Sequence, residues 1–211
     1  MSSIFSSELF IEFSTILIFL LTVPLASLMT YKFIKKKGKS QLYWSVGLWL
    51  FGIGVLLEIL FSFNIYNAFL IKAYLTAVAF LVSFLALGST ALLKNKKIFN
   101  YYAIFFILSA VFVLYSLIVS NIGNVLTNYV VFGVLPVLVV ISSSVMTFPA
   151  AAILIAVAVI SYRKTSNKKM LSIIAGVVVV SIAGSLYIAH FPAFLYYSEF
   201  IGILLLWLGF I

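Results

Sequence analysis

Two glutamates are the residues of this chain with the most chemistry to offer, because each lies inside a long apolar stretch. Glu58 follows Trp44, Gly47, Phe51 and Gly54 at spacings of three or four residues, which places all five on one stripe of a helix. An ionisable group inside a membrane span is costly and indicates a functional site by default. Because glycines on a stripe indicate the close approach of another helix, Glu58 is predicted to face the protein interior.

Glu199 repeats this pattern, since Glu199, Gly202, Leu206 and Gly209 share one helical face. Counting 1.5 Å per residue from the helix ends brings further polar residues to the same depth. The predicted polar cluster consists of Glu58, Glu199, His190, Lys72, Glu12, Tyr187 and Tyr196, and the predicted helix-packing glycines are Gly47, Gly54, Gly176, Gly184, Gly202 and Gly209. The cluster is either an outward-facing polar cavity that serves as a proton-binding pair, a cation site or the vestibule of a transport path, or a set of pairs that fixes helix packing. In the second case Glu58 and Glu199 pair with Lys72, His190 or tyrosines.

Most familiar activities are excluded by residues that the sequence lacks. Without cysteine there is no thiolate chemistry and no Cys-ligated metal or iron–sulfur centre, and without aspartate there is no Ser-His-Asp triad. A single histidine cannot provide bis-His haem ligation, and no lysine follows Lys169 to form a retinal Schiff base. The sequence therefore predicts no catalytic residues, no cofactor and no metal site, and a protein that is not an enzyme.

The composition places these residues in a membrane. Hydrophobic residues make up 65% of the chain and charged residues only 8%, far from the balance of a soluble domain. The formal net charge of +9 does not indicate nucleic-acid binding, because no polar surface is large enough to carry a basic footprint. Instead, the charge is expected to contact anionic lipid headgroups.

Basic residues set the expected topology. All but Lys72 of the 13 lie in three short clusters, 32–39, 94–97 and 163–169. Short loops rich in Lys and Arg stay on the cytoplasmic side, and a crossing needs about 20 apolar residues. The first apolar run is expected to be a retained span with its N-terminus outside, because the segment before it carries glutamates and no basic residue.

The interval 98–162 holds 65 residues without a charge, and both of its ends are expected in the cytoplasm. Two crossings fit this interval, which leaves an apolar stretch outside. Asn, Gly, Pro136 and the run Ser142 to Ser144 interrupt that stretch and argue against one continuous span. The sequence predicts that Val130 to Val140 form a helix that lies in the outer interface or dips into the bundle, followed by a break before the fifth span.

The resulting fold class is all-α: a single transmembrane helical bundle of seven spans, with the N-terminus outside, the C-terminus cytoplasmic and an additional outer segment. The expected spans are about 10–31, 42–63, 70–93, 101–120, 147–163, 170–189 and 193–211, with the outer interfacial segment at about 127–145.

Three stretches carry a resemblance to a known family. YWSVGLWLFGIGVLLEIL, ALGSTALL before a basic turn, and YYSEFIGILLLWLGFI together resemble small seven-span prokaryotic membrane proteins with a Trp/Gly/Glu second span and a Glu-x-x-Gly last span. The resemblance covers most of the chain. It implies the same fold and importance for Glu58, Gly54, Glu199 and Gly202, and it implies no activity.

Two functions are compatible with the sequence. The first expectation is a small structural or accessory subunit of a larger complex in the cell membrane, associated with lipids and with other membrane subunits or further copies of itself. The alternative is a transporter of a small solute or cation, in which Glu58 and Glu199 are proton-coupled groups of an outward-facing cavity.

Overall fold

The structure is a computed structural model that describes residues 8–93, 95–122, 126–127, 130–131, 135–166, 169, 171–173, 175–176, 179 and 192–210. Its helices are α1 (Glu8–Lys36), α2 (Lys39–Ser62), α3 (Ala68–Leu92), α4 (Lys96–Val119), α5 (Val137–Thr165) and α7 (Pro192–Phe210). The helices α1 to α5 are long and apolar enough to cross a membrane. The chain is therefore an all-helical, multi-pass membrane protein, as the composition predicts.

Short polar side chains define where two of the helices begin. The side chain of Asn67 accepts a hydrogen bond from the backbone N–H of Leu70 at the start of α3. Asn95 does the same for Lys97 and Ile98 at the start of α4. These caps satisfy donors that lack a partner within the helix. Both asparagines lie in the intervals that the charge pattern assigns to turns between spans.

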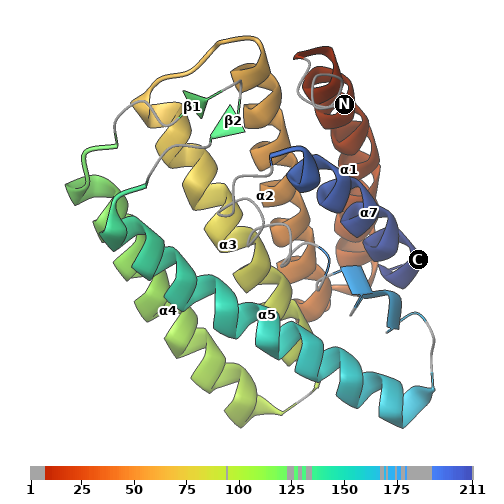
Figure 1. Ribbon diagram of the computed structural model, residues 1–211. Coiled ribbons are helices and arrows are strands. Elements are labelled where there is room, and N and C mark those ends of the chain that lie inside the picture. The colour runs from red at the N-terminus through yellow and green to blue at the C-terminus, as the bar shows by residue number, and fades with distance from the viewer. Residues whose placement is uncertain are drawn as a thin grey trace.

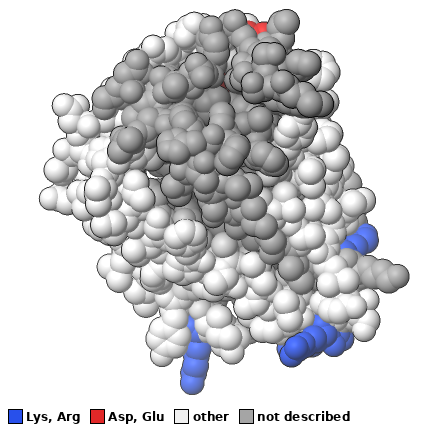
Figure 2. Space-filling view, viewed as in Figure 1, with Lys and Arg blue, Asp and Glu red and all other residues white. Residues whose placement is uncertain are grey.

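The helices pack in an antiparallel bundle around α2 and α3 (Figure 1). Helix α2 lies between α1 and α3, α3 also contacts α4 and α5, and α7 packs against α1. The basic residues at the end of α1, the starts of α2 and α4 and the end of α5 lie at one end of the bundle, which we call the basic end (Figure 2). Acidic surface is visible at the opposite edge of the same view.

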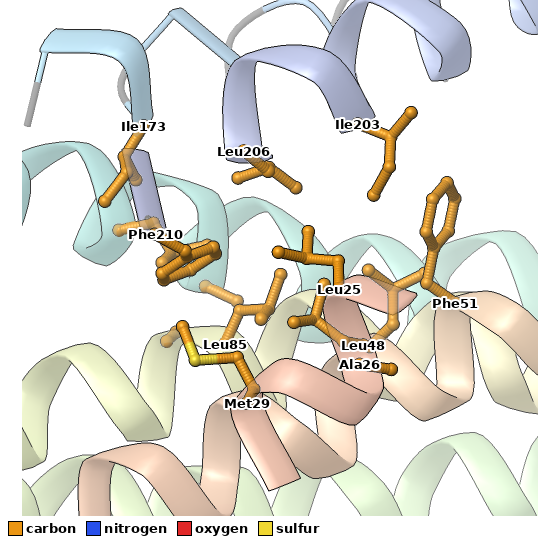
Figure 3. Packing of buried hydrophobic residues seen from close by; sticks show 14 of the residues in the cluster. Leu25, Ala26, Met29, Leu48, Phe51, Leu85, Ile173, Ile203, Leu206 and Phe210 are labelled. Carbon is orange, nitrogen blue, oxygen red and sulfur yellow. The ribbon is translucent and has the colours of Figure 1, made fainter. Parts of the chain in front are cut away.

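The largest group of buried side chains joins α1, α2, α3 and α7 (Figure 3). It includes Leu25, Met29, Leu48, Phe51, Leu85, Ile203, Leu206 and Phe210. A second group lies between α2, α3, α4 and α5 and includes Leu57, Phe61, Ile71, Val113 and Met146. In a bilayer these contacts are stabilised by close packing rather than by exclusion of water.

The region between α4 and α5 differs from the prediction. Instead of a helix over Val130 to Val140, the structure has an antiparallel pair of two-residue strands, β1 (Leu126–Thr127) and β2 (Val130–Val131), and α5 then starts at Val137. The predicted break before the fifth span is also wrong, because α5 continues without interruption past the serine run and Pro149. The fifth helix thus begins ten residues before the expected start at 147.

The serine run does not end the helix because its hydroxyl groups find partners within the bundle. Ser142 donates to the carbonyl oxygen of Val139 at 3.1 Å, and its hydroxyl lies 2.6 Å from that of Ser116 on α4. Thr147 donates to the carbonyl of Ser143 at 2.9 Å. Such local bonds leave the helix intact, and a hydroxyl pair between helices is a common packing contact in membranes. Most of the expected sixth span, 170–189, lies outside the described residues.

Candidate functional site

The carboxyl groups of Glu58 and Glu199 meet inside the bundle. They come from α2 and α7, and their side chains lie within hydrogen-bonding reach of each other. Glu58 is 5% exposed and Glu199 is 8% exposed. We call these two residues the glutamate pair. Their burial agrees with the helical stripes of both segments, and their contact unites two residues that lie 141 positions apart in the sequence (199 minus 58).

The glutamate pair lies towards the end of the bundle opposite the basic end. Glu58 is about 6 Å along the axis from the last residue of α2, Ser62, and Glu199 is about 10 Å from the first residue of α7, Pro192. Since these are the ends remote from the basic residues, both carboxyl groups share the same half of the bundle. This is the depth that counting along the sequence predicts for them.

A tyrosine on α3 completes the connection between three helices. The hydroxyl of Tyr74 donates a hydrogen bond of 2.7 Å to Oε1 of Glu58, and the ring of Tyr74 packs edge-on against Phe61 at 5.7 Å between centroids. Tyr74 is itself buried. The site thus draws one polar side chain from each of α2, α3 and α7.

A hydrogen bond within the glutamate pair requires a proton, because an ionised carboxylate only accepts hydrogen bonds. Such a bond therefore forms only while at least one of the two carboxyl groups is protonated. The second oxygen of each carboxyl group, Oε2 of Glu58 and Oε2 of Glu199, is buried and has no hydrogen-bond partner among the described residues. Buried polar atoms without a partner are uncommon in proteins and indicate strain, a functional role or a bound water or ion.

The other predicted members of the polar cluster differ in burial, and none of those that the structure describes forms an ion pair with the glutamate pair. Tyr196 is 2% exposed and lies three residues before Glu199 on α7, whereas Glu12 and Lys72 are only half-buried. Neither glutamate of the pair forms an ion pair with a basic side chain in the part of the chain that the structure describes. His190 and Tyr187 lie outside the described residues. The structure therefore joins Glu58 to Glu199 and to Tyr74 rather than to Lys72.

The predicted packing glycines also divide into groups. A Cβ at Gly47 would lie 3.0 Å from the backbone oxygen of Leu81, and a Cβ at Gly209 would lie 2.3 Å from Cγ1 of Ile173. A Cβ at Gly176 would lie 3.2 Å from Cβ of Leu205 and 3.3 Å from the oxygen of Gly202. A side chain would therefore force a neighbour to shift at Gly209, whereas Gly47 and Gly176 permit contacts that are tight for a Cβ. Gly202 is buried, and Gly184 lies outside the described residues.

Gly54 differs from the other packing glycines, since the nearest atom to its Cβ would be Cγ2 of Val78 at an ordinary 3.9 Å. The single glycine of α3, Gly88, was not singled out from the sequence. A Cβ there would lie 2.3 Å from Cδ1 of Trp44. The signal that could have identified it is the spacing of Leu85 and Ser89 around Gly88, which offers acceptors to an indole N–H from α2.

Comparison with known proteins found no matching family model, no similar curated protein and no similar solved structure. The resemblance to small seven-span membrane proteins stays a prediction from its motifs.

Tyr74 provides a direct check of this geometry. We expect Tyr74→Phe to lower the free energy of unfolding by about 1 kcal/mol, because it removes the bond to Glu58 while keeping the ring against Phe61. Thermal unfolding of the purified protein in detergent measures the effect. Tyr101→Phe is the matched control, since Tyr101 is 74% exposed and its change should stay within about 0.5 kcal/mol. Equal effects of the two variants would contradict the bond.

Proposed function

We propose that this chain is a non-enzymatic carrier of a small solute or cation in the cell membrane, and that the glutamate pair is its proton-binding site. The observation that supports this most strongly is the contact between two buried carboxyl groups from distant segments, which can share a proton, and in which one oxygen of each group has no hydrogen-bond partner among the described residues. Ionisable groups within spans are typical of proton relays in transporters.

We further propose that the chain crosses the membrane seven times, with the N-terminus outside and the basic end of the bundle in the cytoplasm. Two points support it: α7 has 19 residues, a length of about 28 Å, and the apolar stretch 170–189 is long enough for one further crossing. Residues between α4 and α5 then lie outside. With this orientation the glutamate pair lies in the outer half of the membrane.

Proton movement across vesicle membranes tests the proposal. The purified protein is reconstituted into vesicles that hold a pH-sensitive dye, and gradients of sodium, potassium and small neutral sugars are imposed in turn. We expect at least one gradient to change the internal pH in wild-type vesicles and the change to be lost in Glu58→Gln. Protein vesicles that behave like empty vesicles under every gradient, or a fully active Glu58→Gln, would contradict a proton-coupled carrier.

An accessory subunit is the second candidate, and the burial of Tyr74 and the glutamate pair between three helices favours it. In that case the site stabilises the bundle, and the protein associates with other membrane subunits or with copies of itself. Purification from native membranes separates the two functions. Recovery in a defined larger complex, together with loss of folded yield in Glu58→Gln, would support the subunit, whereas normal yield with altered proton movement supports the carrier.

A further inference from the structure

Helix α7 is attached to the bundle in two different ways along its length. Near the basic end, its backbone receives hydrogen bonds from side chains of other segments: Lys32 Nζ donates to the carbonyl of Phe210 at 2.7 Å, and Ser172 donates to that of Leu205 at 2.7 Å. In the opposite direction, the indole of Trp207 donates to the carbonyl of Leu21 at 2.9 Å. None of these three bonds involves a carboxyl group.

Close packing strengthens the same part of α7. The rings of Phe210 and Trp44 lie 4.9 Å apart, and Gly209 allows the side chain of Ile173 to approach the helix backbone. Ile203 and Leu206 are buried in the large apolar group of Figure 3. The segment from Gly202 to Phe210 is thus anchored by contacts that do not depend on the charge of a carboxyl group.

The other part of α7, from Pro192 to Glu199, meets α2 through the glutamate pair. Among the described residues, the titratable groups around this contact are Tyr74 on α3, which donates to Glu58, and Tyr196 on α7 itself, which is buried in the large apolar group. Glu12 on α1 and Lys72 on α3 lie in the same half of the bundle without forming an ion pair to either glutamate in the described chain. No cation of the described residues therefore neutralises the pair.

Loss of a proton shared by the pair changes an attractive contact into a repulsive one. Two ionised carboxylates at hydrogen-bond distance repel strongly in an apolar interior, where little solvent screens them. The single hydroxyl of Tyr74 can stabilise only one of the two charges. Water reaching Oε2 of Glu58 and Oε2 of Glu199 would lower the repulsion, and separation of the helices admits that water.

We propose that release of the shared proton moves the Pro192–Glu199 part of α7 away from α2, while the Gly202–Phe210 part stays in place as the pivot. This inference rests on the proposed carrier function and names the element that opens its site. The proton leaves to water at the open end or to the transported solute, and the helix closes when a proton returns. Water then reaches Oε2 of Glu58 and Oε2 of Glu199 only in the deprotonated state.

Spin-label distances in the full-length protein test this motion. The native sequence contains no cysteine, so that labels can be introduced in pairs without background. Phe63→Cys with Tyr197→Cys reports on the half with the glutamate pair, and Leu42→Cys with Leu208→Cys reports on the basic end; all four native side chains are at least 36% exposed. Each labelled protein is reconstituted in lipid nanodiscs and measured in mildly acidic and in mildly alkaline buffer.

We expect the distance between positions 63 and 197 to increase in alkaline buffer and the distance between positions 42 and 208 to stay constant. Glu58→Gln/Glu199→Gln in both labelled backgrounds is the control, because amides keep a hydrogen bond without titrating, and the increase should disappear. An unchanged 63–197 distance, an equal change at both ends, or a change that persists in the control would overturn the inference.

This result is independent of the vesicle experiment. Proton movement in vesicles without a change of the 63–197 distance would leave the carrier standing and exclude a moving α7. A distance change without proton movement under any gradient would support the motion of α7 and contradict the carrier function.

Discussion

Gly88→Ala is expected to lower the free energy of unfolding substantially, although it adds a single methyl group. The new Cβ would lie 2.3 Å from Cδ1 and 2.6 Å from Nε1 of the Trp44 indole. That ring cannot simply turn away, because Nε1 donates to the carbonyl of Leu85 at 3.1 Å and to the hydroxyl of Ser89 at 3.2 Å. Overpacking of this kind costs about 1–3 kcal/mol, and loss of the indole bond adds about 1 kcal/mol.

Gly54→Ala is the matched control on α2. Its Cβ has an ordinary contact with Val78 at 3.9 Å, and alanine is favoured over glycine in a helix by about 0.5–1 kcal/mol. We therefore expect opposite signs for the two alanine variants in thermal unfolding in detergent. Trp44→Phe combined with Gly88→Ala should cost less than the sum of the single changes, since the smaller ring leaves room for the methyl group. A Gly88→Ala protein as stable as the wild type would mean that the indole does not lie over Gly88.

Removal of the glutamate pair is expected to be strongly non-additive. Glu58→Leu removes the partner of the Glu199 carboxyl group and the acceptor of the hydrogen bond from Tyr74, and a buried polar group that loses its partner costs about 1–3 kcal/mol. Glu199→Leu leaves Glu58 still bonded to Tyr74, so that its cost should be smaller. In the double variant the buried carboxyl group that Glu58→Leu leaves behind is gone, and apolar side chains replace both carboxyl groups. Its stability should therefore exceed that of Glu58→Leu.

Unfolding of the four proteins by heat or by denaturing detergent gives this double-mutant cycle. The coupling free energy between the two positions is expected to be about 1–3 kcal/mol, the range for residues in direct contact. Glu12→Leu provides the control, because Glu12 is only half-buried and its change should be additive with Glu58→Leu. If the costs of Glu58→Leu and Glu199→Leu simply add, the two carboxyl groups are not in contact.

The sequence predicts the parts of the fold that depend on local composition. Apolar length and charged turns are sufficient to place α1 to α4 close to their expected spans, because the membrane allows few other structures for such segments. The serine run before Pro149 misled the prediction for α5. Serine is a poor helix residue in water, but in an apolar interior its hydroxyl bonds to a preceding carbonyl and the helix continues.

The sequence predicts which residues belong to the candidate site better than it predicts which of them contact each other. A helical stripe identifies Glu58 and Glu199 as interior residues, since the period of a helix fixes which side chains share a face. It cannot determine which helices become neighbours, and Lys72 was as plausible a partner as Glu199. The indole contact with Gly88 was missed for the same reason: it depends on the approach of α2 to α3, which no single segment encodes.

The unequal surroundings of the helices have a consequence for how this sequence can diverge. Helix α2 has neighbours on two sides, and 12 of its 24 residues are buried. Helix α4 instead exposes a row of apolar side chains that includes Ile104, Leu108, Val111 and Ile118. A lipid-facing position requires only an apolar side chain, so one apolar residue of α4 can be replaced by another. Positions on α2 must fit particular neighbours. Homologous proteins should therefore share more residues in α2 than in α4, where only the hydrophobic character is expected to be retained.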